Sequence, residues 1–177
     1  MSDSTHLYAI TNQHVLTFSG LDSSKFMQGQ FSCNLNEVTH VQYRRGSCCN
    51  AKGRMVASFS LAHFHDAFLL ALDASLAEAL QTHLKKYMVF FKSKIELNPY
   101  TLAGIKGPDA ERILSATFGG CPSEDFAQHI FEHGLIIKLP FNAGYEIWME
   151  QAHSASPLKA LESECTQTSK GTWQHNL

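Results

Sequence analysis

Apolar and polar residues alternate along several short stretches in the first half of the chain, and a period of two is typical of half-buried strands. Turn-forming pairs, Lys52-Gly53 and His65-Asp66, separate the later stretches. The pattern therefore predicts a β-meander, in which successive strands pair as neighbours. The stretches are residues 14–18, 41–50 and 55–61, and the apolar run 68–72.

Helical spacing is clearest between residues 73 and 88. Leu76, Leu80 and Leu84 recur at every fourth position, which places them on one face of a helix. Asp73 or Ser75 can accept hydrogen bonds from the first-turn amides, so the helix is expected to begin near these residues. Shorter helices are expected to begin at Asp22 or Ser23, after Gly107-Pro108, and at Ser156-Pro157.

Further strands are expected beside these helices, and Pro99 marks a boundary between two segments. We expect residues 1–99 to form the first part of an α+β domain. Residues 100–177 are expected to form a second, incomplete α+β segment packed on it. Strands in runs with interspersed helices predict an α+β fold with mainly antiparallel sheet. These further strands are residues 89–91, 94–97, 102–105, 135–139 and 144–149.

Composition narrows the class of protein. The chain has 177 residues, of which 44% are hydrophobic and 17% charged, as in a soluble globular protein. Its net charge of -2 argues against a surface that binds nucleic acid all over. A membrane-spanning helix needs about 20 apolar residues, and no run is that long. The polar N-terminus lacks the layout of a signal peptide, so we predict a cytoplasmic protein with no membrane partner.

Cysteine and histidine positions do not indicate a metal site. The five cysteines contain no C-x-x-C pair, and neighbours such as Cys48 and Cys49 point to opposite faces of a strand. We expect reduced thiols, with a redox role as the alternative. His63 and His65 could share a strand face and bind one metal, but no third ligand lies near them in sequence. Exposed histidines are therefore expected there.

Two motifs carry a resemblance to a known family. Residues 26–38 (FMQGQFSCNLNEV) and 46–61 (GSCCNAKGRMVASFSL), followed by a strand–helix–strand ending in KSKIEL, resemble the N-terminal part of the folate-binding YgfZ family. Residues 102–114 (LAGIKGPDAERIL) are similar to that family's middle segment, so the resemblance covers essentially the whole chain. It implies the fold of the glycine-cleavage T-protein, an aminomethyltransferase that uses tetrahydrofolate. It also implies a role in maintaining iron–sulfur enzymes and in tRNA modification.

Two departures from the family pattern bear on activity. The family's K-G-C-x-x-G-Q-E motif is absent and would lie beyond Leu177, and the apolar C-terminal residue fits a shortened protein. We therefore expect the C-terminal part of the fold to be missing. The T-protein has an acidic pair where this chain has Ala57 and Ser58, and neither can accept a proton near neutral pH. No catalytic residue is predicted, and aminomethyl transfer is not expected.

The predicted binding residues lie in the two motifs. Lys52 and Arg54 flank Gly53 and could attract a folate glutamate tail; the alternative is a solvated hairpin tip. Asn50 could hydrogen-bond to the pterin ring, or could simply form the turn.

A second pair of amides precedes them in the chain. Gln28 and Gln30 bracket Gly29, and their side chains suit a heterocycle with donors and acceptors. The alternative is a helix end capped by glycine.

A basic cluster with interleaved aromatic residues suggests a further partner. Such clusters can bind single-stranded RNA by charge and stacking. The alternative is that the lysines complement a helix end while the Phe90-Phe91 pair lies in the core. The cluster comprises Lys85, Lys86, Lys92 and Lys94, with Tyr87, Phe90 and Phe91 between them.

Three functions remain open at this point. The first is a folate-binding accessory protein that assists iron–sulfur maintenance and tRNA modification. The second is a tetrahydrofolate-dependent aminomethyltransferase, which glycine-dependent methylene transfer would reveal. The third is a scaffold for iron–sulfur assembly partners that does not use folate, and charge reversal at Lys52 and Arg54 would not disturb it.

Overall fold

The computed structural model describes residues 4–167 and Trp173. The chain divides into two compact units. Asn12–Pro99 forms one, here called the inserted unit, and the described residues of Met1–Thr11 and Tyr100–Leu177 form the other, the terminal unit. Apart from Trp173, the last residues, on which the expectation of a shortened protein rested, lie outside the described part.

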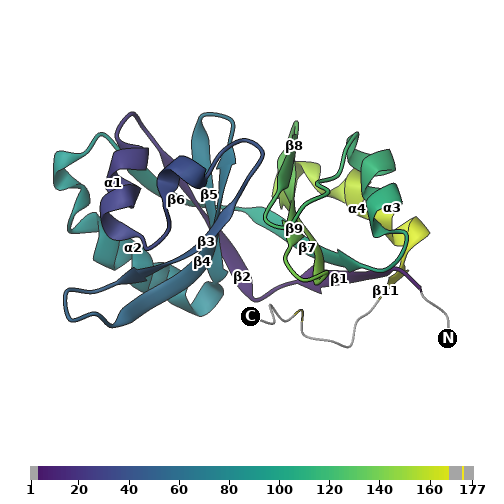
Figure 1. Ribbon diagram of the computed structural model, residues 1–177, viewed down its shortest axis with the longest axis horizontal. Helices are drawn as coiled ribbons and strands as arrows, with labels where there is room; N and C mark the ends of the chain where they lie inside the picture. The colour runs from purple at the N-terminus through teal and green to yellow at the C-terminus, as the bar shows by residue number, and fades with distance from the viewer. Residues whose placement is uncertain (1–3, 168–172, 174–177) are drawn as a thin grey trace. The chain divides into compact units, whose positions relative to one another are not determined.

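The inserted unit is built on a five-stranded antiparallel sheet (Figure 1). The strand order is β3-β4-β5-β2-β6, so β3, β4 and β5 form the predicted meander and β2 joins it from earlier in the chain. The strands are β2 (Gln13–Ser19), β3 (Arg44–Cys49), β4 (Met55–Phe64), β5 (Ala67–Asp73) and β6 (Lys94–Asn98).

Helices α1 (Ser23–Gln30) and α2 (Ala77–Lys85) cover one face of this sheet (Figure 1). Of the predicted leucine repeat, Leu80 and Leu84 are buried in the core on α2, whereas Leu76 lies in the preceding 3₁₀ turn and is partly buried. The Asp73 carboxylate accepts the Ser75 amide as expected, but it caps a short 3₁₀ turn that precedes α2. Three 3₁₀ helices complete the unit, namely η1 (Leu35–Glu37), η2 (Ala74–Leu76) and η3 (Met88–Phe90).

The terminal unit contains a six-stranded sheet in the order β11-β1-β7-β10-β9-β8. All its ladders are antiparallel except the parallel β1–β11 pair. The helices α3 (Ala110–Phe118) and α4 (Ala155–Glu164) enclose a core with the sheet, and η4 (Gln151–His153) follows β10 directly. The strands are β1 (His6–Ile10), β7 (Tyr100–Lys106), β8 (Gln128–Phe131), β9 (Gly134–Leu139), β10 (Gly144–Glu150) and β11 (Thr166–Gln167).

The structure confirms the predicted α+β class with mainly antiparallel sheet. Two expectations are corrected. The first segment does not begin at residue 1, because β1 pairs with β7 and so the described residues 4–11 belong to the terminal unit. Residues 89–91 are not a strand, since the Phe91 amide closes a 3₁₀ turn onto the Met88 carbonyl at 2.9 Å. No helix in the described part of the chain is both apolar enough and long enough to cross a bilayer.

Candidate functional site

The β3–β4 turn is fixed by the Asn50 side chain. Its Oδ1 accepts the backbone N–H groups of Lys52 and Arg54, both at 3.0 Å. The Asn50 carbonyl accepts the Gly53 amide at 2.9 Å, and Gly53 has a φ of 74°, which a glycine adopts without steric cost. Asn50 is therefore a turn former. Its side-chain oxygen Oδ1 is not available to a ligand, but its side-chain amino group can still donate a hydrogen bond.

Lys52 and Arg54 extend from this turn into solvent. Neither side chain makes an ion pair with any residue that the structure describes. By contrast, the Arg44 guanidinium on the same hairpin pairs with Glu37 at 2.9 Å. Two uncompensated cations, two residues apart on a fixed backbone, create a local positive potential that suits a flexible anion.

The end of α1 lies beside the end of β3. Phe31, which follows α1, forms an antiparallel bridge with Cys48. The Ser32 amide also donates to the Ser47 carbonyl at 2.9 Å. Gln30 precedes this bridge and Asn50 follows it, so the structure brings Gln30 to the same end of the hairpin as the Asn50–Arg54 turn.

Gln28 is directed elsewhere. Its Oε1 accepts the Leu35 amide at 2.8 Å and so ties α1 to η1, which leaves the amino group as a donor. The alternative of a glycine cap is wrong, because Gly29 lies within α1 and Phe31 ends the helix with its N–H on the Met27 carbonyl. Of the predicted residues, the structure thus groups Gln30 with Asn50, Lys52 and Arg54, and sets Gln28 apart.

The neighbouring positions of the hairpin offer little acid–base or thiol chemistry. Ala57 is fully buried opposite Cys48, and Ser58 is exposed opposite Ser47. Cys48 and Cys49 do point to opposite sides, one buried and one exposed. Burial raises the pKa of the Cys48 thiol to about 11, which disfavours the reactive thiolate at neutral pH.

The paired histidine face does not form. β4 ends at Phe64, and His65 lies in the following turn with a φ of 51°. His63 instead stacks between His40 and Phe68, with ring centroids 4.0 and 4.6 Å away. Burial, with a smaller contribution from His40, lowers the pKa of His63, so the ring is neutral at physiological pH. The predicted pair thus splits into a packed ring and an exposed one.

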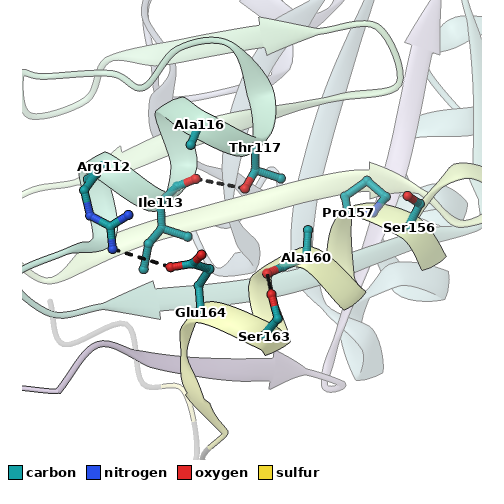
Figure 2. Close-up of a pocket in the computed structure, with 9 residues that line it drawn as sticks. All are labelled: Arg112, Ile113, Ala116, Thr117, Ser156, Pro157, Ala160, Ser163 and Glu164. Carbon is teal, nitrogen blue, oxygen red and sulfur yellow. Dashed lines mark hydrogen bonds and ion pairs between the residues drawn. The ribbon is translucent and has the colours of Figure 1, made fainter.

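A cavity of about 410 Å³ lies between α3 and α4 in the terminal unit (Figure 2). Arg112 and Glu164 face each other across it at 3.5 Å and neutralise each other. Thr117 and Ser163 turn their hydroxyls back to carbonyls of their own helices, Ile113 and Ala160 (Figure 2). The lining therefore presents few unused polar groups, and it includes none of the predicted folate-binding residues.

The sequence of this chain is similar to those of known proteins. No family model matches the sequence. Proteins named tRNA-modifying protein YgfZ from Vibrio vulnificus strains YJ016 and CMCP6 are each 31% identical to this chain over 106 residues. The match covers 60% of this chain and 33% of each relative, so the chain matches about one third of the length of these curated relatives. The predicted resemblance to YgfZ is confirmed.

Solved structures agree on the fold. The glycine cleavage system aminomethyltransferase T from Bartonella henselae has a TM-score of 0.79 at 17% identity, covering 93% of this chain and 48% of that protein. A heterotetrameric sarcosine oxidase from Corynebacterium sp. U-96 has a TM-score of 0.64 at 10% identity, covering 93% of this chain and 85% of the matched chain. The chain therefore has a T-protein-like fold.

Proposed function

We propose that this chain is part of a folate-binding accessory protein of the YgfZ type, in which the β3–β4 turn binds the glutamate tail of tetrahydrofolate. The observation that carries the proposal is the pair of exposed cations, Lys52 and Arg54, on a backbone held by Asn50. An arginine can bind a carboxylate through two parallel hydrogen bonds, while a lysine acts as a point charge. The α- and γ-carboxylates of a glutamate tail offer a target for each.

The pterin ring would bind beside the turn. Its carbonyl oxygen and ring nitrogens accept hydrogen bonds, and the side-chain amino groups of Gln30 and Asn50 can donate them. Gln28 keeps a free donor too, although its carbonyl oxygen is bound to the Leu35 amide. The fit is partial: these residues supply donors and cations for one wall of a folate site.

The wider role follows from the relatives. Proteins similar to this chain are named as tRNA-modifying, and the resemblance implies support of iron–sulfur enzymes in the cytoplasm. We extend both roles to the whole protein, of which iron–sulfur proteins would be partners. Aminomethyl transfer is not included, because Ala57 and Ser58 supply a methyl and a hydroxyl group where the T-protein has acids.

Calorimetric titration with reduced folates that carry one or several glutamates tests the proposal. At about 4 Å in water, each cation–carboxylate contact contributes about 1 kcal/mol, so loss of two contacts weakens binding about 30-fold. The variant K52E/R54E should lose at least this much and should no longer prefer the longer tail. The matched control, K85E/K86E, changes the net charge equally in the same unit and should bind as the wild type does.

The other outcomes separate the alternatives. Absence of folate binding at millimolar concentration would refute the proposal. Capture of iron–sulfur assembly proteins that is the same for wild type and K52E/R54E, without folate binding, would favour a scaffold. Glycine-dependent methylene transfer to tetrahydrofolate would instead restore the aminomethyltransferase.

A second candidate function, contact with single-stranded RNA, has one specific observation in its favour. The expectation that Phe90 and Phe91 both lie in the core is only half right. Phe91 packs on Phe26 with ring centroids 5.3 Å apart, whereas Phe90 is 92% exposed and Val89 75% exposed. An exposed ring with lysines on both sides in sequence suits stacking on a base.

Fluorescence anisotropy with a short single-stranded RNA tests this contact. Replacing Phe90 by Ala should weaken binding by about 1–3 kcal/mol if a base stacks on the ring. K85E/K86E should weaken it further and reduce its salt dependence, while K52E/R54E serves as the charge-matched control. Equal RNA binding by wild type, F90A and K85E/K86E would exclude the cluster as an RNA site.

A further inference from the structure

A group of three potential metal ligands lies at the end of β10 in the terminal unit. The imidazoles of His133 and His153 and the carboxylate of Glu150 each offer one ligand atom, and these atoms all lie within 4.8 Å of one another. The His133 Nδ1 is 3.2 Å from a Glu150 carboxylate oxygen. The rings of His133 and His153 stack with centroids 3.6 Å apart.

The β9–β10 ladder brings His133 and Glu150 together. Met149 pairs with Gly134, and the Glu150 amide donates to the His133 carbonyl at 2.9 Å, which extends the ladder by one step. Gly134 is required there, because a side chain would collide with the Trp148 carbonyl. The backbone of two of the three ligands is thus fixed by sheet hydrogen bonds.

The 3₁₀ helix η4 supplies the third ligand. Glu150 is its N-cap residue and His153, three positions further on, is its last residue. Ser154 holds the end of η4, since its hydroxyl donates to the Gln151 carbonyl at 2.9 Å and accepts from Thr101 at 3.2 Å. An anchored turn thus carries both Glu150 and His153, whose ligand atoms lie in the same cluster.

A second carboxylate lies near the other ring nitrogen of His133. Glu132 lies 3.7 Å from His133 Nε2, on the side of the ring opposite Glu150. When a metal replaces the hydrogen bond between Nδ1 and Glu150, the proton moves to Nε2 on the Glu132 side and the Nδ1 lone pair points at the cluster, as in the carboxylate–histidine–metal arrangement of many metalloproteins. The side chains of His133 and Glu150 are 37% and 39% exposed, so an ion can reach them from solvent.

We propose that His133, Glu150 and His153 form a binding site for a divalent transition-metal ion, for which Zn²⁺ is the natural probe. Two imidazoles and one carboxylate suit Zn²⁺, at bond lengths of about 2.0–2.2 Å. Such bonds place ligand atoms roughly 3–3.5 Å apart, so the existing separations need only a modest contraction. Three protein ligands leave coordination positions open to water or to another small ligand.

Binding requires one identifiable movement. Lone pairs of imidazole nitrogens lie in the ring planes, and the planes of His133 and His153 are inclined by only 7°. Two stacked rings cannot both direct lone pairs at one ion, so one ring must turn. His153 is the exposed partner on the short η4 helix, and its ring would rotate away from the stack.

Calorimetric titration of the purified, tag-free chain with ZnCl₂ tests the site. We expect one equivalent of Zn²⁺ to bind, and E150Q and H153Q each to weaken the affinity at least about tenfold. H153Q changes an exposed side chain outside the ladder, so folding should be preserved, and thermal unfolding without metal checks this. H14Q, which removes an exposed histidine of the inserted unit, is the matched control and should bind as the wild type does.

Nitrogen-15 NMR of the histidine rings provides a second measurement. Saturation with Zn²⁺ should shift the ring signals of His133 and His153 together and should leave those of His14 unchanged. Zn²⁺ affinity that is equal in wild type, E150Q and H153Q would overturn the proposal. So would ring signals of His133 and His153 that do not respond to the metal.

Discussion

Replacing Asn50 by Ala would remove the acceptor that organises the β3–β4 turn. Two hydrogen bonds to Asn50 Oδ1 are lost, from the amides of Lys52 and Arg54. Each is worth about 0.5–1.5 kcal/mol net, and water can replace part of this at an exposed turn, so we expect N50A to lower the free energy of unfolding by about 1–2 kcal/mol. Asn50→Asp keeps an acceptor oxygen and should stay within about 0.5 kcal/mol of wild type.

Urea denaturation followed by circular dichroism measures the difference. Indole fluorescence is unsuitable, because Trp148 and Trp173 both belong to the terminal unit. In folate binding, N50D keeps the turn but loses the amino donor and adds a negative charge beside Lys52 and Arg54, so it should bind folate more weakly than wild type although the turn is intact. An N50A variant as stable as wild type, with unchanged hydrogen exchange at the Arg54 amide, would refute the view that Asn50 holds this turn.

Three further predictions concern thiols, backbone and pH. Cys49 should react with iodoacetamide well before the buried Cys48, and C49S should remove the fast phase seen by mass spectrometry. Gly107→Ala should destabilise the chain by about 2 kcal/mol or more, measured by chemical denaturation, because φ is 143° and the added carbon collides with Thr5. The pKa of His63 is lowered in the folded state, so the unfolded chain binds a proton at a higher pH than the folded chain does. The free energy of unfolding should therefore fall as the pH drops through about 6.5. In H63Q, thermal stability should fall less steeply between pH 7 and pH 5.

Local sequence patterns were sufficient to predict most helices and strands of the inserted unit. The leucine repeat of α2 and the alternation of β4 depend on neighbouring residues, and both elements form within or around the predicted ranges, although α2 begins only at Ala77 and β4 extends to Phe64. β1 was missed because a strand of five residues at a polar terminus has little pattern of its own, and its partner β7 lies ninety or so residues further along. The apolar residues of η3 suggested a strand, but Val89 and Phe90 face solvent.

In the candidate sites, too, contacts between residues close in sequence were predictable and contacts between distant residues were not. The Asn50–Arg54 turn was predictable, because all its hydrogen bonds join residues within four positions. The Gln28 contact with Leu35 was not, since it depends on how α1 meets η1. The proposed metal ligands were missed although Glu150 and His153 have a recognisable i, i+3 spacing, because the third residue, His133, is placed only by the register of β9 and β10.

The most direct test of the central claim is a map of where folate binds. Titration of the nitrogen-15-labelled chain with tetrahydrofolate should shift the backbone amides of residues 50–54 most strongly, together with the side-chain amide of Gln30. K52E/R54E should abolish these shifts at the same ligand concentration. Shifts confined to other regions, such as the α3–α4 cavity around Arg112, or no shifts at saturating folate, would contradict the account.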